Sequence, residues 1–266
     1  MVSCYHPVRW IIAGVLGLAV LSPWLASTLQ SADERNAGGT RESTKGTHDI
    51  RMISGWEVKI SRKLLEKEPE LTEKAMVLLK VQLEDVRKVV PPFALREIQK
   101  VPIWVSPEYP GQQPRAEYHP GAGWLRENGR DPAMAKAVEI TDTKDFESEC
   151  KRMPMLMLHE LAHAYHDRVL GFDHPEIVAA YDRAKKSGKY DKVERRFANG
   201  NTRMERAYAM TNPQEYFAEC SEAFFGVNDW YPYTLDQLKK HDPEVVPILE
   251  KLWKNPQGRK GKDLEE

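Results

Sequence analysis

The chain has 266 residues, of which 41% are hydrophobic and 30% are charged, and its formal net charge is −1. This length and apolar content are enough to bury the core of one domain. The nearly neutral charge balance excludes nucleic acid as an expected partner.

The first 48 residues are predicted to lie outside the folded domain. Residues 10–21 form an apolar run that follows Arg9 and precedes small residues, the layout of a secretory signal peptide. Residues 1–30 are therefore predicted to be a signal peptide, or an uncleaved N-terminal anchor that would be the only contact with a membrane. Residues 31–48 predict a flexible linker. We expect a secreted, periplasmic or otherwise extracytoplasmic protein.

The first half of the folded part predicts a small twisted mixed sheet backed by a helix. Its elements are a strand, a helix and two further strands, over 52–60, 72–90, 101–105 and 137–141. The Gly-rich aromatic segment 118–125 suits an extended strand at the edge of this sheet. Such an edge could hydrogen-bond an extended peptide, with Trp124 facing it, although core packing explains a lone Trp somewhat better.

A second helix is predicted over 155–170, where apolar residues recur at helical spacing. His159 and His163 would lie one turn apart on one face, where two imidazoles can bind one metal ion. Glu160 would lie beside the water on such a metal and could take its proton. Because only three positions of His-Glu-x-x-His are fixed, a buried amphipathic helix without metal explains the pattern equally well.

The C-terminal lobe is predicted to be mainly helical. A helix is predicted over 175–186 and a hairpin over 193–197 with 204–210. An acidic and aromatic helix follows over 213–225, then an aromatic loop over 230–233 and a last helical stretch over 235–253. Asn212 suits the N-terminal cap of the helix over 213–225. The folded domain is thus an α+β structure over 49–253, and 254–266 predict a charged, solvated tail.

Two histidines leave a zinc site one protein ligand short. His166 shares their face but lies a further turn along the helix, so we assign it a structural or outer-sphere role. Glu215 could be the third ligand, and Glu219, four residues later, could hold a ligand histidine by its other N–H. Spacing alone narrowly favours a capping-box role for Glu215 over the role of zinc ligand. With Asn212 as the helix cap, Glu215 occupies the third helical position, where the acidic residue of a capping box belongs.

Three cysteines are present, and Cys4 lies in the predicted signal segment. In an oxidising compartment Cys150 and Cys220 could form one disulfide, which would tie the His helix to the helix of Glu219. Two separate buried thiols are an equally good interpretation.

The two motifs together resemble those of a known family. His159-Glu160-x-x-His163, followed by Tyr208-x-x-Thr211-Asn212-x-x-Glu215-Tyr216-Phe217-Ala218-Glu219, is similar to the gluzincin metallopeptidases, the zincins to which the anthrax lethal factor catalytic domain belongs. The resemblance implies a zincin-like fold, one Zn²⁺ per chain on His159, His163 and Glu215, Glu160 as general base, Tyr208 as a phenol near the metal, and Glu219 behind a ligand histidine. Pro213 and Cys220-Ser221 depart from the family pattern but leave the ligands intact.

The function implied by the resemblance is that of a zinc metalloendopeptidase that hydrolyses peptide bonds of a peptide or protein substrate, and we expect it to be secreted and monomeric. One alternative is an exported binding protein that keeps the fold without catalysis, and the intact Glu160 weighs against it. Another is a zinc amidase that acts on cell-wall peptides. Trp124 and Tyr233 would suit a peptide groove in either enzyme, so they do not discriminate.

Overall fold

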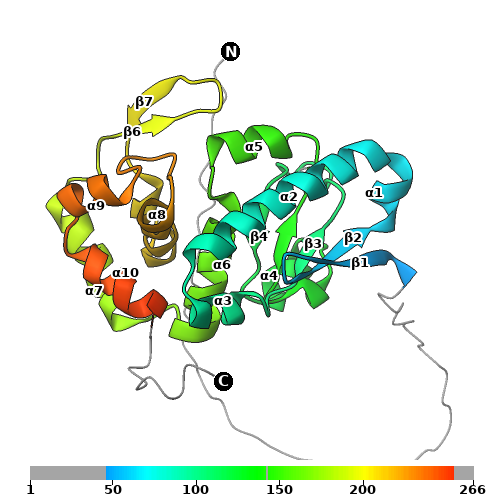
Figure 1. Cartoon of the computed structure of the whole chain (residues 1–266), viewed down its shortest axis with the longest axis horizontal. Helices are drawn as coiled ribbons and strands as arrows, with labels where there is room; N and C mark the ends of the chain where they lie inside the picture. Colours follow the sequence, from blue (N-terminus) through cyan, green and yellow to red (C-terminus); the bar gives the residue numbers. More distant parts are fainter. Residues whose placement is uncertain (1–45, 142, 255–266) are drawn as a thin grey trace, which may run out of the picture. The chain divides into compact units, whose positions relative to one another are not determined.

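The computed structural model describes residues 46–141 and 143–254, all within one compact unit (Figure 1). These residues form a mixed α+β structure, which confirms that prediction. The predicted signal segment, most of the linker and nearly all of the tail lie outside the described residues. His48 already belongs to the first strand, so the linker ends earlier than predicted. Among the described residues, no helix has the length and apolar character needed to span a membrane.

A five-stranded sheet has the order β1-β2-β3-β5-β4. Its strands, in that order, are His48–Ile53, Trp56–Ser61, Ile103–Val105, Val138–Ile140 and Ala116–Tyr118. The pairs β2–β3 and β3–β5 are parallel, whereas β1 and β4 run antiparallel to their neighbours and form the two edges.

The single strand predicted over 52–60 is wrong, because this segment contains the turn of a hairpin. Ser54 and Gly55 both have positive φ, at 52° and 97°, and join Ile53 of β1 to Trp56 of β2. Two residues with positive φ make the tight turn whose twist matches that of a β-hairpin.

The two faces of the sheet differ in polarity. Val58, Ile103 and Val138 are register partners on one face, and they join buried residues of α2 (Pro69–Val89) and α6 (Leu156–Tyr165) in the main core. On the other face, Trp104 lies beside Glu139. Trp104 packs in a smaller cluster with residues of α4 (Ala122–Glu127) and η2 (Pro132–Met134).

The edge strand predicted over 118–125 is too long. β4 ends at Tyr118, and Trp124 belongs to α4. Pro120-Gly121 interrupts the strand, and one helical turn then buries Leu125 against Trp104.

Helix α6 lies between the sheet half and the helical half of the described chain, in contact with α2, β4 and α8 (Figure 1). Gln82 of α2 holds its first turn: the side-chain amide donates to the Pro154 carbonyl at 2.9 Å, and the Met157 N–H donates to Gln82 Oε1 at 3.3 Å. The predicted helix over 155–170 continues as the π-helical segment η3 (His166–Leu170) and ends at Gly171, whose φ is +86°.

The remaining helices upstream of α6 are α1, α3 and α5, over Arg62–Lys67, Pro92–Ile98 and Phe146–Arg152. The C-terminal half contains α7, β6, β7, η4, α8, α9 and α10, over Pro175–Ser187, Val193–Arg196, Thr202–Glu205, Tyr208–Met210, Pro213–Phe225, Leu235–His241 and Val245–Lys254. The predicted hairpin forms, but its second strand ends at Glu205 and Tyr208 begins a 3₁₀ turn. The Trp253 ring stacks on Tyr165, with centroids 4.5 Å apart, and joins α10 to α6.

Replacing Gln82 by Met should lower the free energy of unfolding by about 1–3 kcal/mol, because the buried N–H of Met157 at the start of α6 would lose its partner. Urea unfolding followed by circular dichroism measures this difference. Lys80→Met on the same helix is the control, since the Lys80 side chain is 61% exposed and its replacement should change stability by less than about 0.5 kcal/mol. Equal effects of both substitutions would contradict this role of Gln82.

Candidate metal centre

Three potential ligand atoms meet at one point between α6 and α8. His159 Nε2 and His163 Nε2 lie 3.1 Å apart, and Glu215 Oε2 lies 3.2 Å from the first and 3.3 Å from the second. Ligands about 2.0–2.1 Å from a tetrahedral zinc are separated by about 3.3 Å. The three atoms therefore have the spacing of one face of a tetrahedral zinc site, and their residue types match its donors.

Two helices position the three candidate ligands. His159 and His163 lie one turn apart on α6. At the start of α8, the Glu215 N–H donates to the side chain of its cap, Asn212, at 2.8 Å. The Glu215 carboxylate contacts the two imidazoles instead of turning back to the cap, so the capping-box interpretation of this side chain is wrong.

The site requires a positive charge. Glu215 Oε2 is buried and accepts no hydrogen bond from the described residues. Burial would raise the pKa of Glu215, but the imidazoles of His163 and His159 outweigh it and hold this pKa far below its ordinary value. Burial would lower the pKa of His159, but the carboxylates of Glu215 and Glu222 raise it well above its ordinary value. A proton on an imidazole and a metal ion would therefore compete for the position between these three atoms.

A second carboxylate holds His159 from behind. His159 Nδ1 lies 2.7 Å from Glu222 Oε1, whereas Glu219 Oε1 lies 3.9 Å from the same nitrogen. Because a carboxylate accepts, Nδ1 carries the proton and Nε2 presents its lone pair to the centre. The predicted partner, Glu219, thus does not make this bond. Glu222 follows Glu215 by seven residues, about two turns, and lies on the same stripe of α8.

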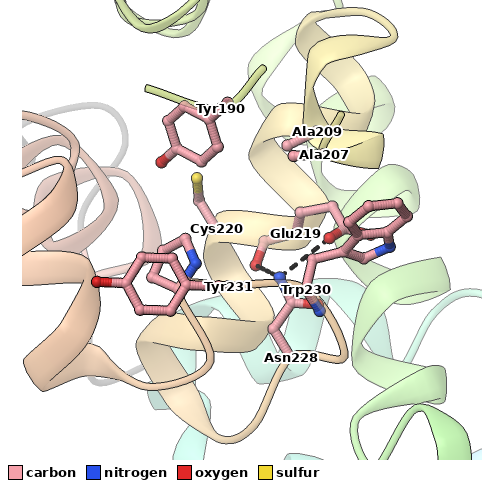
Figure 2. A pocket seen from close by; sticks show the side chains of 9 residues that line it. Tyr190, Ala207, Ala209, Glu219, Cys220, Asn228, Trp230 and Tyr231 are labelled. Atoms are coloured by element: carbon pink, nitrogen blue, oxygen red, sulfur yellow. Dashed lines mark hydrogen bonds between the residues drawn. The ribbon is translucent and has the colours of Figure 1, made fainter. Parts of the chain in front are cut away.

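Glu219 lies next to this pair, and its other oxygen, Oε2, accepts a hydrogen bond from Asn228 Nδ2 at 3.0 Å (Figure 2). Burial and the neighbouring Glu222 raise the pKa of Glu219 well above its ordinary value. A cavity of about 10 Å³, the size of one water, lies beside it. Figure 2 shows the Cys220 thiol directed toward Tyr190 in this cavity. Cys220 is a buried free thiol, so it forms no disulfide with Cys150.

The candidate base Glu160 adjoins the ligands and the edge of the sheet. Its Oε2 accepts a hydrogen bond from the Tyr118 N–H of β4 at 2.8 Å. Burial raises the pKa of Glu160, and the imidazoles of His159 and His163 oppose that rise. Tyr208 lies beside Glu215. Its hydroxyl donates to Glu215 Oε1 at 3.3 Å, and the residue is 46% exposed.

Two residues predicted for a substrate groove make other contacts. Trp124 stacks on His119, with centroids 5.7 Å apart, and lies under the Arg130 guanidinium. Tyr233 is buried, and its hydroxyl donates to Glu194 Oε1 of β6 at 2.7 Å. Both side chains stabilise neighbouring segments, so neither prediction is supported.

His166 has a structural role, which is one of the two roles expected. It is fully buried, and its ring packs against Phe172 and Phe217. Burial lowers its pKa to about 3. His166 is therefore a neutral imidazole in an aromatic environment.

Glu117, His119 and Glu139 form another group of metal-type side chains, on the polar face of the sheet. Arg130 donates to both carboxylates, and its bond to Glu139 Oε2 measures 2.8 Å. The guanidinium already supplies the cation there, so this group is a buried ion-pair network.

Comparison of the chain with protein-family models, with curated proteins and with solved structures found no significant match. The functional conclusion therefore rests on the geometry of the site.

Zinc affinity should fall about 10–100-fold in Glu222→Gln, because the carboxylate that orients His159 would lose its charge. Glu219→Gln is the matched control, on the same helix and equally buried but 3.9 Å from the same nitrogen, and it should change the affinity far less. Competition with a zinc chelator measures both. A larger loss for Glu219→Gln would reverse the assignment.

Zinc affinity should also fall as the pH is lowered from 8 to 6, by about tenfold per pH unit for each proton displaced. The sign follows from the pKa of His159: because it is raised, the proton stays bound to higher pH and competes with the metal. Chelator competition at several pH values, corrected for chelator protonation, tests this. An affinity that does not change over this range would rule out His159 as a ligand.

Proposed function

We propose that this chain is an extracytoplasmic zinc metallopeptidase with a zincin-like fold of the gluzincin type. The observation that carries the proposal is the convergence of His159 Nε2, His163 Nε2 and Glu215 Oε2 within 3.3 Å of one another. These residues would hold the ion. A bound zinc ion supplies Lewis-acid activation of water and of a carbonyl oxygen.

Glu160 is suited to move the proton. Its carboxylate is buried beside the two imidazoles, and burial raises its pKa, which strengthens it as a proton acceptor. The Tyr118 N–H holds one oxygen at 2.8 Å and so orients the group. Glu160 can then take a proton from water and return it to the leaving amine.

The outer edge of β4 is suited to bind an extended peptide. The Thr141 N–H donates to the Arg115 carbonyl and the His119 N–H to the Ala137 carbonyl, so alternate residues of this segment face β5. The backbone groups of the residues between them therefore point outward. The bond from Tyr118 to Glu160 supports this, because it joins that outer edge to the candidate base. A peptide added as a strand would pass the site.

Tyr208 is suited to stabilise charge on the substrate. Its hydroxyl lies 3.3 Å from Glu215 Oε1, and the residue is 46% exposed, so a substrate can reach it. Burial of the hydroxyl, followed by the charge of Glu215, raises the pKa of Tyr208, which keeps the phenol protonated as a donor. Loss of one such donor lowers turnover by about 10²–10³.

The test combines metal content with cleavage. The full chain should contain about one zinc per molecule and digest an unfolded protein substrate. Glu160→Gln should keep the zinc and lose at least about 10²-fold in turnover, because only the proton acceptor is removed. Glu215→Ala should lose the metal. Mass spectrometry of the metal and of the peptide products measures both.

Purified peptidoglycan, offered in parallel, separates a peptidase from a cell-wall amidase. A wild-type chain that binds no zinc would remove the basis of the proposal. Zinc binding without any cleavage by the wild type would instead favour a non-catalytic binding protein.

A further inference from the structure

The opposite edge of the sheet, β1, is free along its length among the described residues. There β1 pairs with β2 alone. The Arg62 N–H donates to the Thr47 carbonyl, which marks this pair as a hydrogen-bonded position of the ladder. Since such positions alternate in an antiparallel ladder, the backbone N–H and C=O groups of His48, Ile50 and Met52 point away from β2. They can accept a further strand.

Apolar side chains gather along this edge. Met52, Val77 and Ile50 are 69%, 63% and 53% exposed, more than any other large apolar residue in 46–141 and 143–254. Two of them are on β1. Val77 is on α2, one turn after Glu73, and Glu73 Oε1 lies 2.8 Å from Arg51 Nη2 of β1, so Val77 lies on the α2 face of the sheet, opposite to Ile50 and Met52. Exposed apolar groups beside an unpaired edge indicate a surface that another chain covers.

The charges of β1 identify a second copy as that chain. Asp49 and Arg51 precede and follow Ile50 in β1, and both point to the face of the strand opposite to Ile50. If two β1 strands pair antiparallel about a two-fold axis at Ile50, each Asp49 lies opposite the other copy's Arg51. Opposite charges at such cross-strand positions stabilise pairing. Axes at His48 or Met52 leave Asp49 and Arg51 without these partners, so the charges select one register.

We propose that the chain forms a homodimer in which two β1 strands pair antiparallel about Ile50 and join the two sheets. The outward backbone groups of His48, Ile50 and Met52 then bond with those of Met52, Ile50 and His48 in the second copy. Within one copy Arg51 Nε lies 2.9 Å from Asp49 Oδ2, and these side chains, 33% and 44% exposed, would exchange this pairing for the two cross-strand pairs. The dimer does not depend on the proposed chemistry, and it leaves β4, at the other edge, open to the metal centre. It replaces the monomer expected from the sequence.

Charge reversal in the full chain tests the dimer. Sedimentation equilibrium should give a dimer for the unmodified chain. Asp49→Arg alone and Arg51→Asp alone should each raise the dimer dissociation constant at least about tenfold, because each places two like-charged pairs opposite one another. An equimolar mixture of the two variants should restore the dimer, since both arginines of the first variant then face both aspartates of the second across the strand pair.

The controls separate this edge from other surfaces. Arg203→Asp reverses a charge on β7, an edge strand of the two-stranded sheet, and should leave the dimer unchanged. Circular dichroism confirms that each variant is folded. A monomeric unmodified chain, or a dimer that persists in both single variants, would overturn the proposal. So would a mixture that stays monomeric.

If a charge variant does not fold, Ile50→Cys gives a second test. Residue 50 would face its twin at about 5.5 Å between Cα atoms, within the range of a disulfide. Mild oxidation should yield a disulfide-linked dimer, whereas Met204→Cys, at a residue that is 52% exposed, should give only the background of the unmodified chain. Equal yields from both positions would overturn the proposal.

Discussion

The close approach of three candidate ligand atoms is the constraint on which the rest of the structure depends. Two imidazole nitrogens and a carboxylate oxygen lie within 3.3 Å of one another, and Glu215 Oε2 has no hydrogen-bond partner among the described residues. Only a proton or a metal ion can offset the mutual repulsion of these atoms, so the arrangement persists because other contacts hold each ligand. Gln82 fixes the start of α6, Asn212 caps α8, and Glu222 orients His159.

Buried negative charge behind the site links the two halves of the described chain. Asp229 lies near Glu222, and its Oδ2 accepts from Arg152 at 3.0 Å and from Arg195 at 3.4 Å. Arg152 ends α5, and Arg195 belongs to β6. Unpaired buried carboxylates would be strongly destabilising, so the two arginines offset the charge that the centre requires. The same pairs attach the hairpin and α5 to the loop that follows α8.

The two edges of the sheet have different environments, and each follows from strand alternation. On β4, the outward N–H of Tyr118 reaches Glu160, so this edge adjoins the candidate metal centre. On β1, the outward groups meet no other described segment, and Ile50 and Met52 beside them are exposed. The sheet therefore has one edge at the candidate metal centre, and its other edge is unpaired among the described residues.

Local signals alone determined the helix of His159 and His163, the Asn212 cap and the placement of Glu215 in the first turn of α8, because each depends on spacing within a few residues. The α+β class followed from the same periodicities. Tertiary structure decided the rest. Whether Glu219 or Glu222 holds His159 depends on where the ring lies against α8, and spacing cannot define that. The bond from Tyr118 to Glu160 joins backbone to side chain across 42 residues, and a backbone donor has no sequence signature. Trp124 is predicted in a strand but lies in helix α4, because burial of Leu125 on Trp104 outweighs the local extended preference of this segment.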